Sequence, residues 1–215
     1  SSEMTSYVVD PADRVAGEIT VPGDKSVSHR AVMFGALAEG RTHVTGFLEG
    51  EDCLSTMKAV AHLGVRVERP GPGEVIVEGV GLHGLHAPTA TLDMGNAGTA
   101  MRRFMGLLSA QPFESELIGD ASLMRRPMER AAMPLRAMGA SLETRDGKPP
   151  VRIHGGQQLQ GIRYEMPVAS AQVKSCVLLA GLRAAGRTRV AEPHPTRDHT
   201  ERMLEAFGWP VERDG

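Results

Sequence analysis

A glycine between two apolar residues separates a helical stretch from a strand-like one at three places in this chain, Leu63-Gly64-Val65, Met138-Gly139-Ala140 and Phe207-Gly208-Trp209. The glycines are 75 and 69 residues apart. Each follows a stretch with helical spacing of apolar residues and precedes one typical of a strand, and the elements upstream recur in the same order. The spacing therefore predicts three similar α/β units.

The first unit has the clearest pattern. Apolar residues at helical spacing predict a helix that runs from a polar turn through Ala38. The elements expected after it are a strand at Thr42–Phe47, a helix at Cys53–Leu63 and a hairpin of Val65–Glu68 with Val75–Glu78.

The second and third units repeat this order. In the second we expect a turn at Asn96–Thr99, a helix to about Ser109, a strand at Glu114–Ile118, a helix at Pro127–Met138 and a hairpin of Ser141–Thr144 with Val151–Ile153. In the third we expect a turn at Ser170–Gln172, a helix to about Ala184, a strand at Arg187–Val190 and a helix at Asp198–Phe207.

The end of the third unit differs. In the first two units the closing strand starts ten to twelve residues after the repeat glycine, and the same count from Gly208 passes Gly215. We therefore expect the third unit to lack its last strand and the chain to be truncated. An ordinary α/β domain with a ragged end is the alternative.

Composition restricts the class of protein. The chain of 215 residues is 41% hydrophobic and 23% charged, with a net charge of −2, which argues against a general grip on nucleic acid or an anionic membrane. No apolar run of about 18 residues and no secretory signal is visible, so a cytoplasmic location is predicted. Cys53 and Cys176 stand alone, as buried thiols do, and no metal cluster is apparent.

Three turns at matching positions carry the candidate chemistry. They read Gly23-Asp24-Lys25-Ser26-Val27-Ser28-His29-Arg30, Gly95-Asn96-Ala97-Gly98-Thr99-Ala100-Met101-Arg102 and Ala169-Ser170-Ala171-Gln172-Val173-Lys174-Ser175. Free backbone N–H groups and the helix dipole favour anions at such turns. Helix capping by the Ser, Thr and Asn side chains is the alternative.

These motifs resemble those of EPSP synthases. The resemblance is carried by Val21–Arg30, Leu92–Arg102, Arg125-Arg126-Pro127-Met128, Pro167–Ser175 and, in the form of the class II branch, Thr196–Glu201. It implies transfer of the enolpyruvyl group of phosphoenolpyruvate to the 5-hydroxyl of shikimate 3-phosphate, a step in aromatic amino-acid biosynthesis, without metal or cofactor. It also implies domains of three βαβαββ units, the third incomplete here.

The same resemblance implies a domain division. Residues 1–20 would be a crossover segment of the other domain, and 21–215 the substrate-binding domain. The C-terminal domain would be the missing partner and would carry the main acid–base residues. We therefore expect Val8–Arg14 to lack its sheet partner, and the chain alone to bind shikimate 3-phosphate weakly with negligible turnover. The whole enzyme is expected to be monomeric.

The resemblance also assigns roles to residues. Shikimate 3-phosphate would be bound by Lys25, Ser26, Arg30, Ser170, Ala171, Gln172 and Arg197. Phosphoenolpyruvate would be bound by Lys25, Asn96, Gly98, Thr99, Arg126 and Gln172. Lys25 would touch both substrates. Ala171 stands where many relatives have a second Ser, so one side-chain contact is absent, and with Gly98 room for glyphosate should remain.

Several residues keep two interpretations. His29 is expected on the helix surface or behind the site, with an acid–base catalyst as the alternative. Glu51 and Asp52 are expected as helix-start acids. Arg102 could contact substrate or form a helix-packing ion pair. Lys174 could support the pocket or lie on the helix surface.

Two other functions remain open. One is the related enolpyruvyl transfer to UDP-N-acetylglucosamine, and the other is a non-catalytic phosphate-binding module on the same scaffold.

Overall fold

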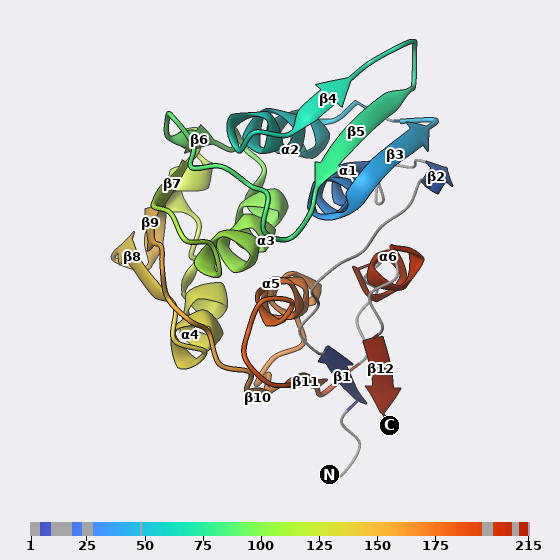
Figure 1. Cartoon of the computed structure of the whole chain (residues 1–215). Coiled ribbons are helices and arrows are strands. Elements are labelled where there is room, and N and C mark those ends of the chain that lie inside the picture. Colours follow the sequence, from blue (N-terminus) through green and yellow to red (C-terminus); the bar gives the residue numbers. More distant parts are fainter. Residues whose placement is uncertain are drawn as a thin grey trace.

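In the computed structural model, the described residues are 5–9, 19–22, 28–47, 49–194, 200–207 and 211–214. The side chains of 5–9, 19–22, 28, 200, 201, 206, 213 and 214 lie outside this description. Three four-stranded sheets lie on the outside of the molecule, and the helices lie between them (Figure 1).

The first unit forms one complete sheet in the order β2-β3-β5-β4, in which β3 is parallel to β2 and antiparallel to β5. Its elements are β2 (Ile19–Pro22), α1 (Ser28–Leu37), β3 (Glu39–Thr45), α2 (Glu51–His62), β4 (Arg66–Glu68) and β5 (Val75–Val80).

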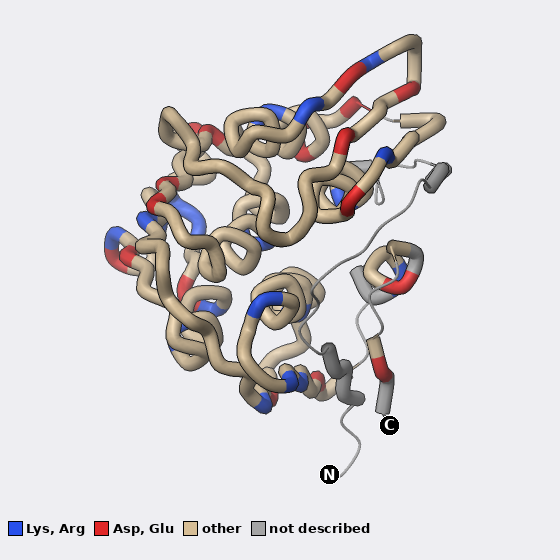
Figure 2. The backbone as a smooth tube through the Cα atoms, in the orientation of Figure 1, with Lys and Arg blue, Asp and Glu red and all other residues tan. Residues whose placement is uncertain are grey.

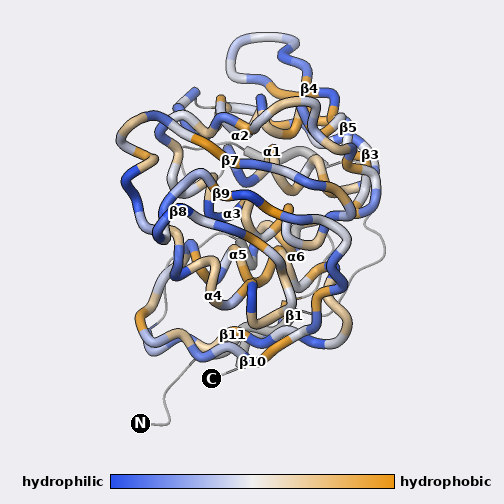
Figure 3. Tube along the Cα trace, turned by 90° about the vertical axis from the view of Figure 1, so that its left-hand side faces the viewer, coloured by the Kyte–Doolittle hydropathy of each residue, from blue (hydrophilic) through white to orange (hydrophobic). Residues whose placement is uncertain are grey.

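The second unit repeats that topology as β6-β7-β9-β8, again with one parallel and two antiparallel pairings. Its elements are β6 (Leu92–Asp93), α3 (Gly98–Ser109), β7 (Ser115–Ile118), the 3-10 turn η1 (Leu123–Arg125), α4 (Glu129–Ala137), β8 (Ser141–Arg145) and β9 (Lys148–His154). Strands β7, β8 and β9 alternate between hydrophilic and hydrophobic residues and cover the helices behind them (Figure 3).

The third unit takes a strand from the other end of the chain. Its own elements are β10 (Arg163–Glu165), α5 (Ala171–Gly181), β11 (Thr188–Glu192), α6 (Thr200–Ala206) and β12 (Val211–Asp214). The sheet order is β10-β11-β1-β12, so β1 (Thr5–Val9) occupies the position that β5 and β9 hold in the other sheets. Strand β1 is antiparallel to both β11 and β12, just as β5 and β9 are antiparallel to both of their neighbours.

This arrangement confirms one expectation and corrects another. Among the described residues the third unit contributes three strands of its own, as expected, and β1 supplies the hydrogen-bonding edge that β11 requires at the position of the missing strand. Val8 pairs with Arg189 and Glu212, so it does not lack a sheet partner. The rest of the segment expected to be unpaired, residues 10–14, lies outside the described residues, and the expected domain boundary after residue 20 falls within β2.

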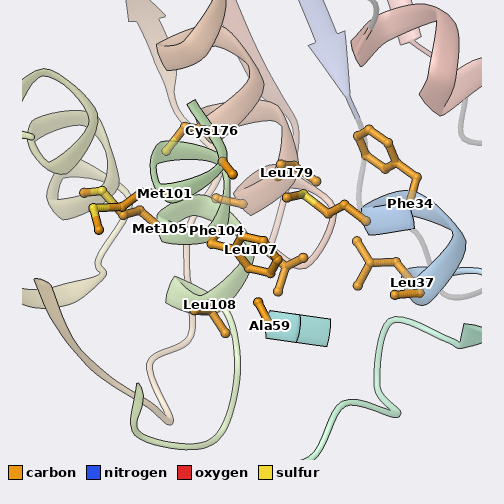
Figure 4. Close-up of a cluster of buried hydrophobic side chains, with 14 of the residues drawn as sticks. Phe34, Leu37, Ala59, Met101, Phe104, Met105, Leu107, Leu108, Cys176 and Leu179 are labelled. Carbon is orange, nitrogen blue, oxygen red and sulfur yellow. The ribbon is translucent and has the colours of Figure 1, made fainter. Parts of the chain in front are cut away.

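A single apolar core joins the units at the centre. Figure 4 shows Phe34 and Leu37 of α1, Phe104 and Leu107 of α3 and Leu179 of α5 in one buried cluster. The axis of α3 approaches α5 closely at Gly106, where a Cβ atom would lie 2.1 Å from the carbonyl oxygen of Cys176. Glycine is therefore required for this crossing, which sets how the starts of the two helices face each other.

The predicted helices are confirmed, with ends shifted by up to three residues. The strands that open each unit, β2, β6 and β10, were not predicted. They contain only two to four residues, too few for an alternating pattern to be recognised.

Candidate functional site

The start of α3 lacks a side-chain cap. Its N-cap residue is Ala97, so neither Asn96 nor Thr99 caps the helix, and the capping interpretation of this turn is wrong. The turn is instead fixed by two carboxylates. The Asn96 N–H donates to Oε1 of Glu51 (2.8 Å), and the Gly95 N–H donates to Oδ1 of Asp93 (2.9 Å). No acidic residue lies in the first turn of α3 itself, and the Glu51 carboxylate from α2 is an acid that reaches the turn before it.

Two guanidinium groups meet over Gly98. A Cβ on Gly98 would lie 2.7 Å from Nη1 of Arg126 and 3.4 Å from Nη1 of Arg102. The pKa of Arg102 is lowered, first by its burial and then by the neighbouring charge of Arg126. Gly98 therefore gives both cations access to the same small space at the helix start.

Arg102 joins the second and third units through neutral acceptors. Its Nη1 donates to Oε1 of Gln172 at 2.7 Å, and its Nη2 donates to the carbonyl oxygen of Pro127 at 3.0 Å. These partners bear no charge, so Arg102 does not form the helix-packing ion pair considered above. The bond to Gln172 confirms that the second and third turns come together.

The start of α5 is capped. The hydroxyl oxygen of Ser170 accepts a hydrogen bond from the Val173 N–H at 3.3 Å, so capping is what this serine does in the structure. Ala171 and Gln172 follow in the first turn, and both are half-buried. With its Oε1 occupied by Arg102, Gln172 has its amide NH₂ group left as a donor for a ligand.

Asp52 is more than a helix-start acid. Its pKa is raised by burial and by Glu51, while the charges of Arg103, Arg126 and Arg30 oppose that rise. The carboxyl group therefore lies in the field of arginines from α1, α3 and the loop after η1. We call Arg30, Asp52, Gly98, Arg102, Arg126 and Gln172 the helix-start cluster.

Three predicted site residues, Lys25, Ser26 and Arg197, lie outside the described residues. Of the others, Arg30 is on α1 and 6% exposed. Thr99 is half-buried in the first turn of α3. Oδ1 of Asn96, which can only accept, is buried without a hydrogen-bond partner in the described part of the chain.

The sequence did not single out Arg103, which the structure buries one residue after Arg102. His29, expected on the helix surface or behind the site, is 4% exposed and bonded to Arg103. Lys174 is fully buried and paired with Glu192 of β11 at 3.2 Å, so the helix-surface interpretation is wrong. Two adjacent arginines in one helix were the available signal, since their side chains cannot both point to solvent on the same face.

Metal ligation finds no support in the described ranges, where no group of three or more His, Cys, Asp or Glu side chains is placed to hold an ion. Within those ranges there is also no helix of the length and apolarity that crossing a membrane requires. The Cys176 thiol has its pKa raised to about 12 by complete burial, which makes it unreactive.

The geometry defines a class: an α/β protein of three repeated units whose helix starts gather arginines around a glycine turn. Comparison with known proteins makes this specific. The family described as EPSP synthase (3-phosphoshikimate 1-carboxyvinyltransferase) matches residues 9–215, and the chain belongs to that family.

Its curated relatives include two proteins named 3-phosphoshikimate 1-carboxyvinyltransferase. The one from Methylococcus capsulatus is 60% identical over 210 residues, which are 97% of this chain and 48% of the relative. The one from Hydrogenovibrio crunogenus is 58% identical over 214 residues, 99% of this chain and 48% of the relative. A solved EPSP synthase from Acinetobacter baumannii is 60% identical with a TM-score of 0.88, covering 98% of this chain and 48% of that one. The chain thus spans about half the length of these relatives.

Proposed function

We propose that this chain forms the substrate-binding half of an enzyme that transfers the enolpyruvyl group of phosphoenolpyruvate to the 5-hydroxyl of shikimate 3-phosphate. One observation carries the proposal: Arg102 and Arg126 meet at Gly98 while Arg102, within the described ranges, is bonded to neutral oxygens. Both substrates carry a phosphate and a carboxylate. An arginine fork binds such groups in two places at once.

Shikimate 3-phosphate would lie against α1 and α5. Lys25, Ser26 and Arg30 would bind it from the first turn, with Arg30 on its carboxylate. Ser170, Ala171 and Gln172 would bind it from the third, with Arg197 adding charge to the phosphate. The support for this placement is that the charge of Arg30 acts on Asp52, as that of Arg126 does, and that Gln172 is bonded to Arg102.

Phosphoenolpyruvate would lie over the start of α3, where Gly98 lets it approach the backbone. Arg126 would pair with it, Gln172 would donate its amide N–H, and Asn96 and Thr99 would shape the turn. Lys25 would lie between the two substrates.

The contribution of this chain to the reaction would be electrostatic and geometric. Arginines fixed before the substrates arrive stabilise charge on the departing phosphate without reorganising during the reaction. Holding two reactants together removes part of the entropic barrier. Protonation of the methylene group and removal of the hydroxyl proton would rest mainly on the other half of the protein. The cytoplasmic location and monomeric state expected from the sequence stay predictions.

Calorimetric titration of this chain tests the proposal. We expect measurable binding of shikimate 3-phosphate, none of UDP-N-acetylglucosamine at the same concentrations, and no detectable enolpyruvyl transfer by the chain alone. Preferential binding of the nucleotide sugar, or no binding of shikimate 3-phosphate by the folded chain, would overturn the assignment. Product formation by the chain alone would overturn the division of labour.

A further inference from the structure

Arg103 is a buried cation that the proposed substrate contacts do not use. It follows Arg102 in α3, but its side chain points inward and is 1% exposed, which makes it the largest side chain that is fully buried in the described part of the protein. Burying a guanidinium is unfavourable unless its donors are used. A position that retains one beside a binding site therefore calls for an explanation.

The structure gives Arg103 a defined partner across two units. Its Nη1 lies 2.9 Å from Nε2 of His29, which is on α1 and 4% exposed. Arginine has donors only, so His29 must accept at Nε2 and carry its proton on Nδ1. A doubly protonated imidazole would place two cations in contact, so this bond requires the neutral ring.

Each member of this pair is the sequence neighbour of a residue of the helix-start cluster. On α3, the buried Arg103 is next to Arg102, and on α1, the buried His29 is next to Arg30. The charge of Arg103 also acts on Asp52 of α2 and on Cys176 of α5. Arg103 therefore lies near residues of α1, α2 and α5, which come from the first and third units.

We propose that Arg103 and His29 form a positioning pair, which holds α1 against α3 so that Arg30 and Arg102 face one ligand. Neither residue touches the substrate; each acts through its neighbour in sequence. The proposal rests on the proposed function for its ligand, shikimate 3-phosphate, but the pair itself can be observed without ligand.

Substitution of Arg103 in the full chain gives the first test. Arg103→Met keeps much of the volume and removes the donors, and we expect its affinity for shikimate 3-phosphate to fall about tenfold. The control is Arg183→Met, because Arg183 is a half-buried arginine bonded to uncharged partners, the side-chain oxygen of Gln111 and the carbonyl oxygen of Leu82, near the other end of α5. Arg183→Met should lower the melting temperature comparably and leave affinity within about twofold.

Substitution of His29 gives the second test and does not depend on the folding of the Arg103 variant. His29→Gln keeps a neutral acceptor and should stay within about threefold of the starting affinity, whereas His29→Leu should lose about tenfold. Arg103→Met combined with His29→Leu should bind no worse than either alone, because both remove the same bond. Full additivity of the two losses, or a tenfold loss in the Arg183 control, would contradict a positioning role.

Nitrogen NMR of the His29 ring tests the positioning pair independently of the proposed enzymatic function. At neutral pH, Nε2 should be unprotonated and Nδ1 protonated, and Arg103→Met should shift the ring signals together with the backbone amides of Arg30 and Gly98. If the unaltered chain fails to bind shikimate 3-phosphate, the function fails while this readout still tests the pair. A protonated Nε2, or amides of Arg30 and Gly98 that stay unmoved in Arg103→Met, would overturn it.

Discussion

Arginines on the outer sheets and arginines in the helix-start cluster are treated in opposite ways by the fold. On the sheets, Arg41 bonds Glu78 at 2.9 Å and Arg152 bonds Glu116 at 3.0 Å, each directly across neighbouring strands. Charges of both signs lie side by side along β3, β4 and β5 (Figure 2). In the cluster, Arg102 bonds an amide oxygen and a carbonyl, and a second arginine lies beside it.

The difference indicates what each region is for. Exposed ion pairs contribute little to stability and leave no charge for a ligand. At the helix starts the positive charge of the arginines adds to the positive ends of the helix dipoles, with Asp52 as the acid that acts on Arg126 and Arg30. An anionic substrate would complete this region, whereas the sheet pairs are already complete.

The helix crossing beneath the cluster should give the largest effect. Gly106→Ala would place a Cβ 2.1 Å from the carbonyl oxygen of Cys176, which is backbone and cannot turn aside. We expect the free energy of unfolding to fall by about 3 kcal/mol, with loss of ligand binding before loss of the outer sheets. Denaturant unfolding measures the first, and titration at low denaturant the second.

Gly50→Ala is the control for that substitution. Gly50 precedes α2 with φ −133°, and nothing lies within 4 Å of the added Cβ. The change should cost no more than about 1 kcal/mol. Equal destabilisation by both substitutions would show that the crossing is not tight.

Charge removal in the two regions gives the next largest effect. Arg126→Gln should weaken phosphoenolpyruvate binding in the presence of shikimate 3-phosphate by about 30-fold, because a cation facing the anion is lost. Arg152→Gln removes a cation already neutralised by Glu116 and should stay within about twofold. Ligand-detected NMR titration measures both. Similar losses from the two variants would mean that net charge, not the cluster, attracts the ligand.

Much of the fold was predictable because it repeats. The three repeat glycines, and the helical spacing of apolar residues after each turn, define the units from local sequence alone. The strand β1 could not be placed this way, since its position depends on which edge in three dimensions needs a partner, about 180 residues further along the chain. The opening strands β2, β6 and β10 could not be predicted because they are too short to show an alternating pattern.

The candidate site, like the fold, was predictable only where local sequence decides the arrangement. The residue types of the turns indicated an anion site, and Gly98, Arg126 and Gln172 do come together around Arg102. The sequence could not show which of Arg102 and Arg103 faces the ligand. Adjacent residues of a helix point in different directions, and the sequence alone does not set the rotation of α3 about its axis. Nor could it show that Asp52 lies in the field of three arginines from separate elements.

Gly98→Ala should have a smaller effect than loss of Arg126. The added Cβ would lie 2.7 Å from Nη1 of Arg126, the end of a flexible side chain that can move away. We expect stability within about 0.5 kcal/mol of the starting chain. Affinity for phosphoenolpyruvate should fall about fivefold, because the displaced guanidinium no longer faces the helix start. An unchanged affinity would show that Arg126 does not act at this glycine.

The smallest effect should come from a titratable pair on the outer sheets. His154 bonds Glu114 through Nδ1 at 2.9 Å and Glu143 through Nε2 at 3.2 Å. These bonds, first that of Glu114, raise the pKa of His154 above its ordinary value of 6.5. The bond from His154 and then that from the Gly155 N–H lower the pKa of Glu114 below 4.5.

The sign of the pH dependence follows from these shifts. The raised pKa of His154 means that its stabilisation is present below pH 6.5 and is lost as pH rises through the folded-state value. The contribution of Glu114 is present above pH 4.5 and is lost as pH falls through its lowered value. His154→Gln should therefore lower the melting temperature slightly between these limits and not at alkaline pH. Because His154 belongs to an outer sheet and not to the helix-start cluster, the variant should bind shikimate 3-phosphate as the starting chain does. A fall in affinity that follows the His154 titration would contradict the separation of the two regions.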